Sequence, residues 1–320
     1  MKICALILAL ASAALAGEKA TVHAPDDLQP NEILPVLLVE QGIADSYAKL
    51  WPVLSKRMRL IVVETAPLRT MLKLPDARTR IDAAMIDALR EALTRHNINR
   101  CPRVVLAFSA AAPHMGYAAL SRPRLYQGLL LVNSAMRTRD LPPNLEAART
   151  MPVAILHSSR DPGVPAQHAT SVQLALKERG IDASLEIIDS GQHNAPLGEP
   201  GAPAIEKFLK GLGTKPVEGR EIPVAPERIE TDSSDGLRLT ADLYETGDKS
   251  DPILLLFHQA RSGRGEYREI APRLVEAGYN CLALDQRSGN EWAGVANETA
   301  RRAKAEGKPQ NYIDAKPDLV

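Results

Sequence analysis

Residues 103–113 read RVVLAFSAAAP, and the fold is best approached from this stretch. It opens with a short apolar run that is typical of a buried β-strand and reaches Ser109 among small residues. It then continues into residues 112–120, which have the composition of a helix. The sequence therefore predicts a strand, a sharp turn that carries Ser109, and a helix.

A serine on such a turn has the layout of a nucleophile elbow, in which the serine backbone is strained and its neighbours must be small. The usual pattern is G-x-S-x-G, and here Ala107 and Ala111 stand where the glycines would be. Alanine is the next smallest side chain, so the pattern is weakened without being lost. Two interpretations stay open: an elbow, or an ordinary junction with an incidental serine.

Strand-like runs alternate with helix-like stretches through the first two thirds of the chain. We predict strands at 33–39, 60–63, 103–108, 127–132, 153–156 and 185–188, and helices at 44–56, 77–96, 112–120, 166–179 and 204–212. Continuous apolar runs are typical of strands that are buried on both faces of a parallel sheet. The alternation predicts an α/β fold with a doubly wound, mostly parallel sheet over residues 22–214.

A stretch rich in Pro, Gly and Glu over residues 215–228 is interpreted as a linker, and the pattern restarts after it. We predict strands at 229–232, 237–244, 253–257 and 279–284, and a helix at 266–277. The first two strands flank Ser234-Asp235-Gly236, a hairpin signal. Residues 289–310 are polar and poorly periodic, and 311–320 resemble the start of a helix. Residues 229–320 thus form an incomplete second α/β segment.

The N-terminus predicts export. Lys2 precedes an apolar run over residues 3–13, and the sequence ALA at 14–16 fits a cleavage site, so residues 1–16 are interpreted as a secretory signal peptide. The run is too short to span a membrane, so no stable span is expected after cleavage. The alternative is an uncleaved, membrane-associated helix. The expected location is periplasmic or secreted.

The composition narrows the possible partners and cofactors. The 39 basic and 39 acidic side chains of the 320 residues cancel, so nucleic acid is not an expected partner. Beyond the leader, only Cys101 and Cys281 remain, and they predict neither a disulfide framework nor a metal site. The seven histidines are scattered, and no H-E-x-x-H, C-x-x-C or G-x-G-x-x-G motif occurs. We expect no metal and no cofactor, and the sequence does not predict an oligomeric state.

Two polar residues follow later strands of the first domain. Asp161 lies in the loop after the strand over 153–156, and His193 in the loop after that over 185–188. The carboxyl ends of parallel strands meet at one edge of the sheet, so Ser109, Asp161 and His193 are expected together there. A serine nucleophile needs a base to take its proton and an acid to orient that base. The three residues offer this set.

With these residues in view, 33–212 resembles a compact α/β-hydrolase of the esterase and dienelactone-hydrolase-like kind. The resemblance lies in AFSAA, HSSRDPGVP and SGQHN, and in the chain order Ser, Asp, His. It implies that Ser109 is the nucleophile, His193 the base and Asp161 the orienting acid. Cleavage of a small ester or related acyl compound, as by a carboxylesterase, is the function that it implies.

The same resemblance implies an oxyanion hole. One donor would be the backbone N–H of Ala110, and another would come from the loop at Gln41 and Gly42. Glu40 stands where a His-Gly pair commonly begins, and its carboxylate would repel an oxyanion unless it points away. These departures leave a second hypothesis open, that of a catalytically degenerate hydrolase fold serving as a binding or scaffold protein.

The second segment resembles the first half of another dienelactone-hydrolase-like domain. The resemblance lies in LLLFHQARSGRGEY, YNCLALDQRSG and YIDAKPDL. The nucleophile strand, acid and histidine of such a domain would follow Val320, so this segment is not expected to hold a triad of its own. A truncated copy, a cut at a gene boundary, and a degenerate structural module all remain open.

Overall fold

The computed structural model describes residues 20–29, 32–41, 55, 58–213, 225–246, 250–276 and 278–319. The chain divides into two compact units, Met1–Leu74 with Ala84–Ile222 and Pro75–Ala83 with Pro223–Val320. The break between Ile222 and Pro223 falls within residues 215–228, the stretch that was predicted as a linker. The predicted signal peptide at 1–16, nearly all of the helix predicted over 44–56, Gly42, and residues 215–224 lie outside the described residues.

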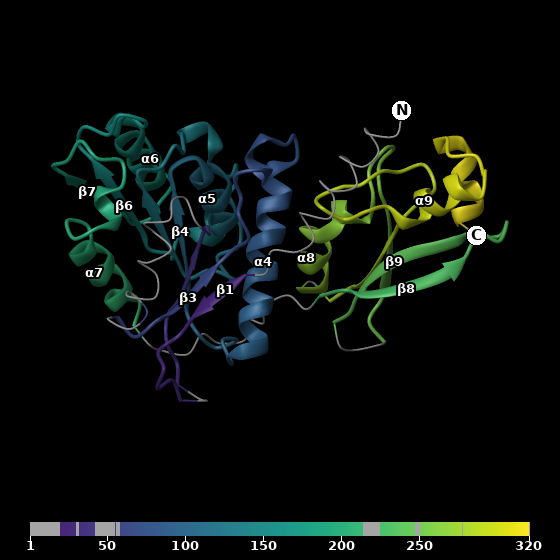
Figure 1. Ribbon diagram of the computed structural model, residues 1–320, viewed down its shortest axis with the longest axis horizontal. Coiled ribbons are helices and arrows are strands. Elements are labelled where there is room, and N and C mark those ends of the chain that lie inside the picture. The colour runs from purple at the N-terminus through teal and green to yellow at the C-terminus, as the bar shows by residue number, and fades with distance from the viewer. Residues whose placement is uncertain are drawn as a thin grey trace, which may run out of the picture. The chain divides into compact units, whose positions relative to one another are not determined.

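The first unit is built on a sheet whose described strands follow the order β1-β3-β2-β4-β5-β6-β7 (Figure 1). The strands are β1 (Thr21–His23), β2 (Val36–Val39), β3 (Ile61–Glu64), β4 (Arg103–Phe108), β5 (Gly128–Val132), β6 (Val153–Ser158) and β7 (Ala183–Ile188). Strand β1 pairs with β3 in the antiparallel direction, and all other pairs are parallel. The predicted mostly parallel α/β sheet is confirmed. Strand β1 was not predicted.

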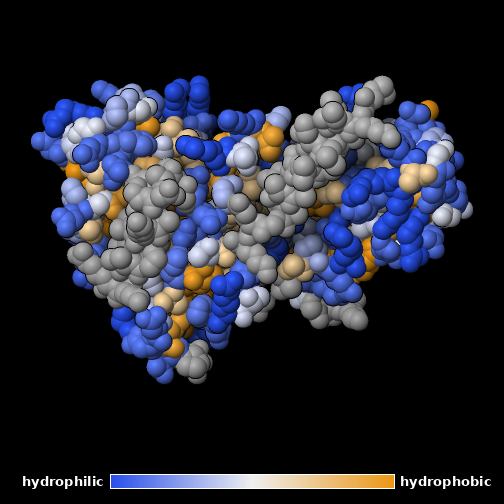
Figure 2. All heavy atoms as spheres, in the orientation of Figure 1, coloured by the Kyte–Doolittle hydropathy of each residue, from blue (hydrophilic) through white to orange (hydrophobic). Residues whose placement is uncertain are grey.

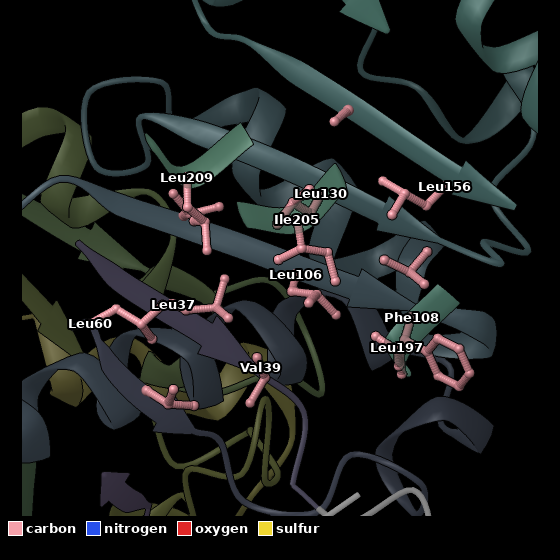
Figure 3. Packing of buried hydrophobic residues seen from close by; sticks show 14 of the residues in the cluster. Leu37, Val39, Leu60, Leu106, Phe108, Leu130, Leu156, Leu197, Ile205 and Leu209 are labelled. Atoms are coloured by element: carbon pink, nitrogen blue, oxygen red, sulfur yellow. The ribbon is translucent and has the colours of Figure 1, made fainter. Parts of the chain in front are cut away.

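Helices cover both faces of this sheet. Among the described residues these helices are α4 (Ala77–Arg95), whose residues up to Ala83 belong to the second unit, α5 (Ala112–Ser121), α6 (Ala166–Glu178) and α7 (Ala202–Leu212). On one face, residues of α7 join a cluster of strand side chains that includes Leu37, Leu106, Leu130, Leu156, Ile205 and Leu209 (Figure 3). On the opposite face, α5 comes so close at Gly116 that a Cβ there would lie 3.3 Å from Leu131. The sheet is therefore held between helices as the doubly wound arrangement requires.

Strand β4 lies between β2 and β5, and all six of its residues are buried. Val104 and Val105 are completely inaccessible to solvent, and Leu106 is 2% exposed. Burial of each such side chain contributes about 1.5–3 kcal/mol relative to leaving it in water. The apolar run that the sequence places here thus provides a rigid support for the turn that begins at Ser109.

The second unit contains a smaller sheet in the order β10-β11-β9-β8. Its strands are β8 (Glu227–Asp232), β9 (Arg238–Tyr244), β10 (Ile253–Phe257) and β11 (Asn280–Leu284). Strands β8 and β9 form the predicted hairpin, with Gly236 at φ 76° in the turn. Strand β10 is parallel to β11, and β11 is antiparallel to β9.

The helices of the second unit depart from the sequence prediction. Helix α8 (Ala271–Glu276) begins later than predicted because Arg264–Arg268 forms a 3-10 turn. Helix α9 (Glu298–Ala305) lies in a stretch where no regular structure was expected, and the Asn297 side chain caps it by accepting from Ala300 N at 2.8 Å. The last described segment, Tyr312–Leu319, is a 3-10 helix with Pro317 inside it.

The coloured surface of the face drawn in Figure 2 is mostly hydrophilic, with hydrophobic residues in small groups. Larger exposed apolar side chains occur on β10, where Ile253 is 54% and Leu255 is 58% exposed. In the part of the chain that the structure describes, every helix is too short or too polar to cross a bilayer.

Candidate active site

Ser109 lies on a strained turn at the carboxyl end of β4. Its φ of 48° falls in the left-handed region, which residues other than glycine rarely adopt. The chain makes a single 3-10 turn over Ser109–Ala111 and enters α5 at Ala112. Ala107 and Ala111 are 0% and 1% exposed, so their methyl groups fit in the space that the usual glycines leave. The backbone is that of an elbow.

Three side chains from separate loops meet at this edge of the sheet. The Oγ atom of Ser109 lies 2.8 Å from Nε2 of His193, and Nδ1 of His193 lies 2.6 Å from Oδ2 of Asp161. Asp161 lies in the loop after β6 and His193 in the loop after β7, so the ends of these strands position both residues. The structure thus brings the three predicted residues into one hydrogen-bonded row.

Asp161 is placed to remain ionised. Burial of its side chain, which is fully inaccessible, opposes ionisation. Hydrogen bonds from His193 and from the backbone N–H groups of Val164 and Gly163, at 2.9 and 2.7 Å, outweigh this effect and lower the pKa of Asp161. A carboxylate there fixes the proton of the imidazole on Nδ1. Nε2 of His193 is then free to accept the proton of Ser109.

His193 is less buried than Asp161. The side chain of His193 is 33% exposed, whereas that of Asp161 is 0% exposed. The ring of Phe108 supports the imidazole from one side, with ring centroids 4.9 Å apart. Ser109 is also partly exposed. The row therefore runs from a dry carboxylate to a hydroxyl that a molecule in solution can reach.

A serine on a strained turn after a central strand, followed along the chain by an acid and a histidine after later strands, is the arrangement of the α/β-hydrolases. The first unit has an α/β-hydrolase fold. The resemblance of residues 33–212 to an α/β-hydrolase, which the sequence predicts, is confirmed for the fold. The resemblance predicted for the second unit stays a prediction.

Comparison with solved structures finds proteins of this kind at low identity. The chain is similar to a truncated carbohydrate esterase from gut microbiota, with 11% identity and a TM-score of 0.44 over 61% of this chain and 91% of the other. A carboxylesterase from Mesorhizobium loti has 18% identity and a TM-score of 0.43 over 56% and 88%. An acylaminoacyl peptidase from Pyrococcus horikoshii has 14% and 0.47 over 63% and 41%. No family model and no curated protein matches the chain.

The two donors expected for an oxyanion hole of this hydrolase fold are only partly within the described residues. Ala110 directly follows Ser109 in the 3-10 turn and is exposed. Gln41 lies just past the end of β2, the strand beside β4, and Gly42 lies outside the described residues. The Oε1 atom of Gln41 is buried and has no hydrogen-bond partner among the described residues.

Glu40, the residue before Gln41, has a raised pKa. Burial raises the pKa of Glu40 to about 7, and the charge of Arg69 acts weakly in the opposite direction. A carboxyl group that is about half protonated at pH 7 carries less of the negative charge that would oppose an oxyanion. The repulsion that Glu40 would exert on an oxyanion is therefore weaker than that of a fully ionised glutamate.

One buried residue of the site was missed by the sequence analysis. Asn133 follows β5, is 0% exposed and has a φ of 38°. Its side chain donates to the backbone oxygen of His193 and, at 3.2 Å, to Oγ of Ser158. The signal was present, because an Asn-Ser pair follows an apolar strand. An asparagine at a strand end is usually a turn residue, however, and it did not stand out.

The side chains near this edge do not form a metal-binding group. Across the described residues, no set of three or more His, Cys, Asp or Glu side chains is close enough together to hold an ion. His157, which precedes Ser158 in β6, is fully buried and its Nε2 pairs with the backbone oxygen of Val164 at 3.0 Å. This contact supports the loop that carries Asp161.

Proposed function

We propose that the first unit is a serine hydrolase that cleaves a small ester or a related acyl compound. The observation that carries the proposal is the 2.8 Å contact between Ser109 Oγ and His193 Nε2, in line with the 2.6 Å contact between His193 and Asp161. The first distance is short enough for proton transfer between a nucleophile and its base, and the second is that of a hydrogen bond that orients the base.

In the first half of the reaction, Ser109 Oγ attacks the carbonyl carbon of the ester while Nε2 of His193 takes the hydroxyl proton. The carboxylate of Asp161 stabilises the imidazolium that forms and keeps its ring oriented. The N–H of Ala110, the residue after the nucleophile, would donate to the developing oxyanion. His193 then gives its proton to the leaving alkoxide, the carbon–oxygen bond breaks, and an acyl group remains on Ser109.

In the second half, water attacks the acyl group with His193 as the base. The carboxylic acid leaves as the bond to Ser109 Oγ breaks, and the serine regains its proton from the imidazolium. The two halves use the same three side chains. No other group needs to change its protonation state.

The partial exposure of Ser109 and His193 supports a small substrate that reaches the row directly from solution. We also propose that the protein acts outside the cytoplasm, in the periplasm or after secretion, on the basis of the leader pattern at residues 1–16.

The test is steady-state hydrolysis of p-nitrophenyl acetate by the purified chain and by Ser109→Ala. We expect the substitution to reduce kcat by at least about 10³-fold, since it removes the nucleophile. Ser159→Ala is the matched control, because Ser159 lies at the same edge of the sheet but donates to Asp189 at 3.1 Å. It should retain activity.

Equal activity of Ser109→Ala and the unaltered protein would refute the proposal. Absence of hydrolysis by the unaltered protein across a panel of small esters, with a native circular dichroism spectrum, would favour the scaffold hypothesis instead.

A further inference from the structure

The segment that follows β5 contacts the backbone of both the nucleophile and the base. The backbone N–H of Ala135 donates to the carbonyl oxygen of Ser109 at 3.0 Å. Two residues earlier, the side chain of Asn133 donates to the carbonyl oxygen of His193. Residues 133–135 therefore connect the turn that carries the hydroxyl to the loop that carries the imidazole.

Both the oxygen and the nitrogen of the Asn133 side-chain amide are hydrogen-bonded, and these bonds determine the orientation of the amide. Its Oδ1 atom accepts the backbone N–H of Ser158 at 2.7 Å, so the oxygen must face β6. Its nitrogen then faces two acceptors, the oxygen of His193 and Oγ of Ser158, the latter at 3.2 Å. Because Ser158 Oγ accepts from Asn133, its own proton is available to the oxygen of Gln192 at 2.8 Å.

The backbone of Asn133 is strained as well as buried. A φ of 38° in a residue that is 0% exposed costs free energy, even though asparagine tolerates the left-handed region better than most residues. Its own N–H donates to the oxygen of Leu156 at 2.9 Å. This backbone conformation places the amide between the end of β6 and the loop that carries His193, where it bonds to both.

We propose that Asn133 is a positioning residue of the hydrolase, which acts by holding the backbone of His193 so that the imidazole stays within reach of Ser109. This inference rests on the proposed function, and it concerns a residue that does not touch the reacting atoms. A displacement of the imidazole by about 1 Å is expected to cost on the order of 10²-fold in rate. Asn133 therefore affects kcat more than KM.

The test compares Asn133→Asp, Asn133→Gly and the unaltered protein in ester hydrolysis between pH 6 and pH 9. Both substitutions tolerate a positive φ, so they alter the hydrogen bonds with little added backbone strain. Asn133→Gly is expected to lower kcat about 10- to 100-fold at every pH, with KM within about threefold. Circular dichroism and thermal melting check that each variant is folded.

Asn133→Asp carries the distinctive prediction. In this variant an ionised carboxylate keeps the acceptor for Ser158 but opposes the carbonyl oxygen of His193, whereas the protonated acid donates to that oxygen again. Its kcat relative to the unaltered protein is therefore expected to fall at least about tenfold from pH 6 to pH 9. The other titratable groups nearby include His193, Asp161, the buried His157, the exposed Arg160–Asp189 pair, and Arg137, Arg139 and Asp140 on the same connection as Asn133. They are present in both proteins, so their titration is largely common to both.

Ser158→Ala serves as a second variant. It removes the contact to Gln192 while the backbone N–H of residue 158 keeps its bond to Asn133, and it should lower kcat less than Asn133→Gly does. The inference would be overturned if kcat of Asn133→Asp stayed within twofold of that of the unaltered protein at every pH. So would variants that lose thermal stability with kcat unchanged. Activity of the unaltered protein tests the proposed function separately, since it does not involve Asn133 variants.

Discussion

The two sheets of the molecule use the carboxyl ends of their parallel strands in different ways. In the first unit, β4, β6 and β7 end in loops whose polar side chains form the row from Ser109 to Asp161, and the row is open to solvent at one end. In the second unit, β11 is followed by Asp285, which is 0% exposed and accepts hydrogen bonds from the side chain and the backbone N–H of Arg264. Arg264 also donates to Asp242 at 2.9 Å.

A second buried cation completes this pattern. Arg287 donates to Asp318 at 2.8 and 2.6 Å and to Asp235 at 2.8 Å. Among the described residues of the second unit, both buried arginines are therefore neutralised by carboxylates of the same unit. In the first unit, the carboxylate of Asp161 faces an imidazole that has a hydroxyl as its other partner. The strand ends of the second unit are thus closed by buried ion pairs, whereas in the first unit one end of the row is left open to solvent.

The largest effect is expected from Asp161→Asn, which removes the charge that distinguishes the open row. Asparagine would donate to Nδ1 of His193 and hold the wrong tautomer, so kcat for a small ester should fall by about 10⁴-fold with KM little changed. Steady-state kinetics with a chromogenic ester measures this. Asp285→Asn, at the closed strand end, should leave kcat unchanged, and a drop of less than tenfold for Asp161→Asn would remove the distinction.

A smaller effect is expected when the buried ion pairs between Arg264 and the carboxylates of Asp242 and Asp285 are broken. Arg264→Met leaves Asp285 buried without its cation and should destabilise this unit by about 3–5 kcal/mol. Urea denaturation followed by limited proteolysis reports the loss, while ester hydrolysis in the absence of urea should continue. The matched control is Arg301→Met, because Arg301 is 71% exposed and pairs with Glu298 at 3.4 Å. Similar losses from both substitutions would show that burial does not set the cost.

A third effect concerns Glu40, a partly buried carboxyl group of the first unit. Its pKa of about 7 lies above the ordinary value of 4.5, so its contribution to stability is fully present below about pH 4.5 and is lost as the pH rises through about 7. Glu40→Gln should therefore gain stability relative to the unaltered protein between pH 5 and pH 9, by up to about 3 kcal/mol. Denaturation midpoints at the two pH values measure the gain. A gain that does not differ between the two pH values would contradict a partly buried, titrating Glu40.

The smallest effect is expected on β10, whose side chains alternate in exposure. Leu255 is 58% exposed, so Leu255→Ala should cost less than about 1 kcal/mol in the free energy of unfolding. Leu106, at the middle of β4, is 2% exposed, and Leu106→Ala should cost about 2–5 kcal/mol. Chemical denaturation of the two variants tests the contrast. Comparable losses would mean that β10 is covered in solution.

The sequence predicted the first sheet and the three residues of its site for the same reason. Uninterrupted apolar runs mark strands that are buried on both faces, and the residues that follow them share one edge of a parallel sheet. Ser109, Asp161 and His193 each follow such a run. The position of β3 outside β2, and the short edge strand β1, were not predicted because pairing between distant strands leaves no local pattern in the chain.

Several features of the structure were not predicted from the sequence, and each has a physical reason. Helix α9 buries only Thr299, Ala300 and Ala303, so it has no large apolar side chains to give a period. The ion pairs of Arg264 and Arg287 join residues far apart along the chain, and no spacing rule links them. Asn133 acts through bonds from one side chain to the backbone of two other loops, which only the folded structure brings together.

The central claim is that the hydroxyl of Ser109 is made reactive by His193, and covalent labelling tests it most directly. The purified chain is treated with a fluorophosphonate, and peptide mapping by mass spectrometry locates the adduct. We predict one adduct per chain on Ser109, absent from Ser109→Ala and slowed at least about 10³-fold in His193→Ala. An unmodified Ser109 in folded protein, or an adduct that forms equally fast without His193, would contradict the claim.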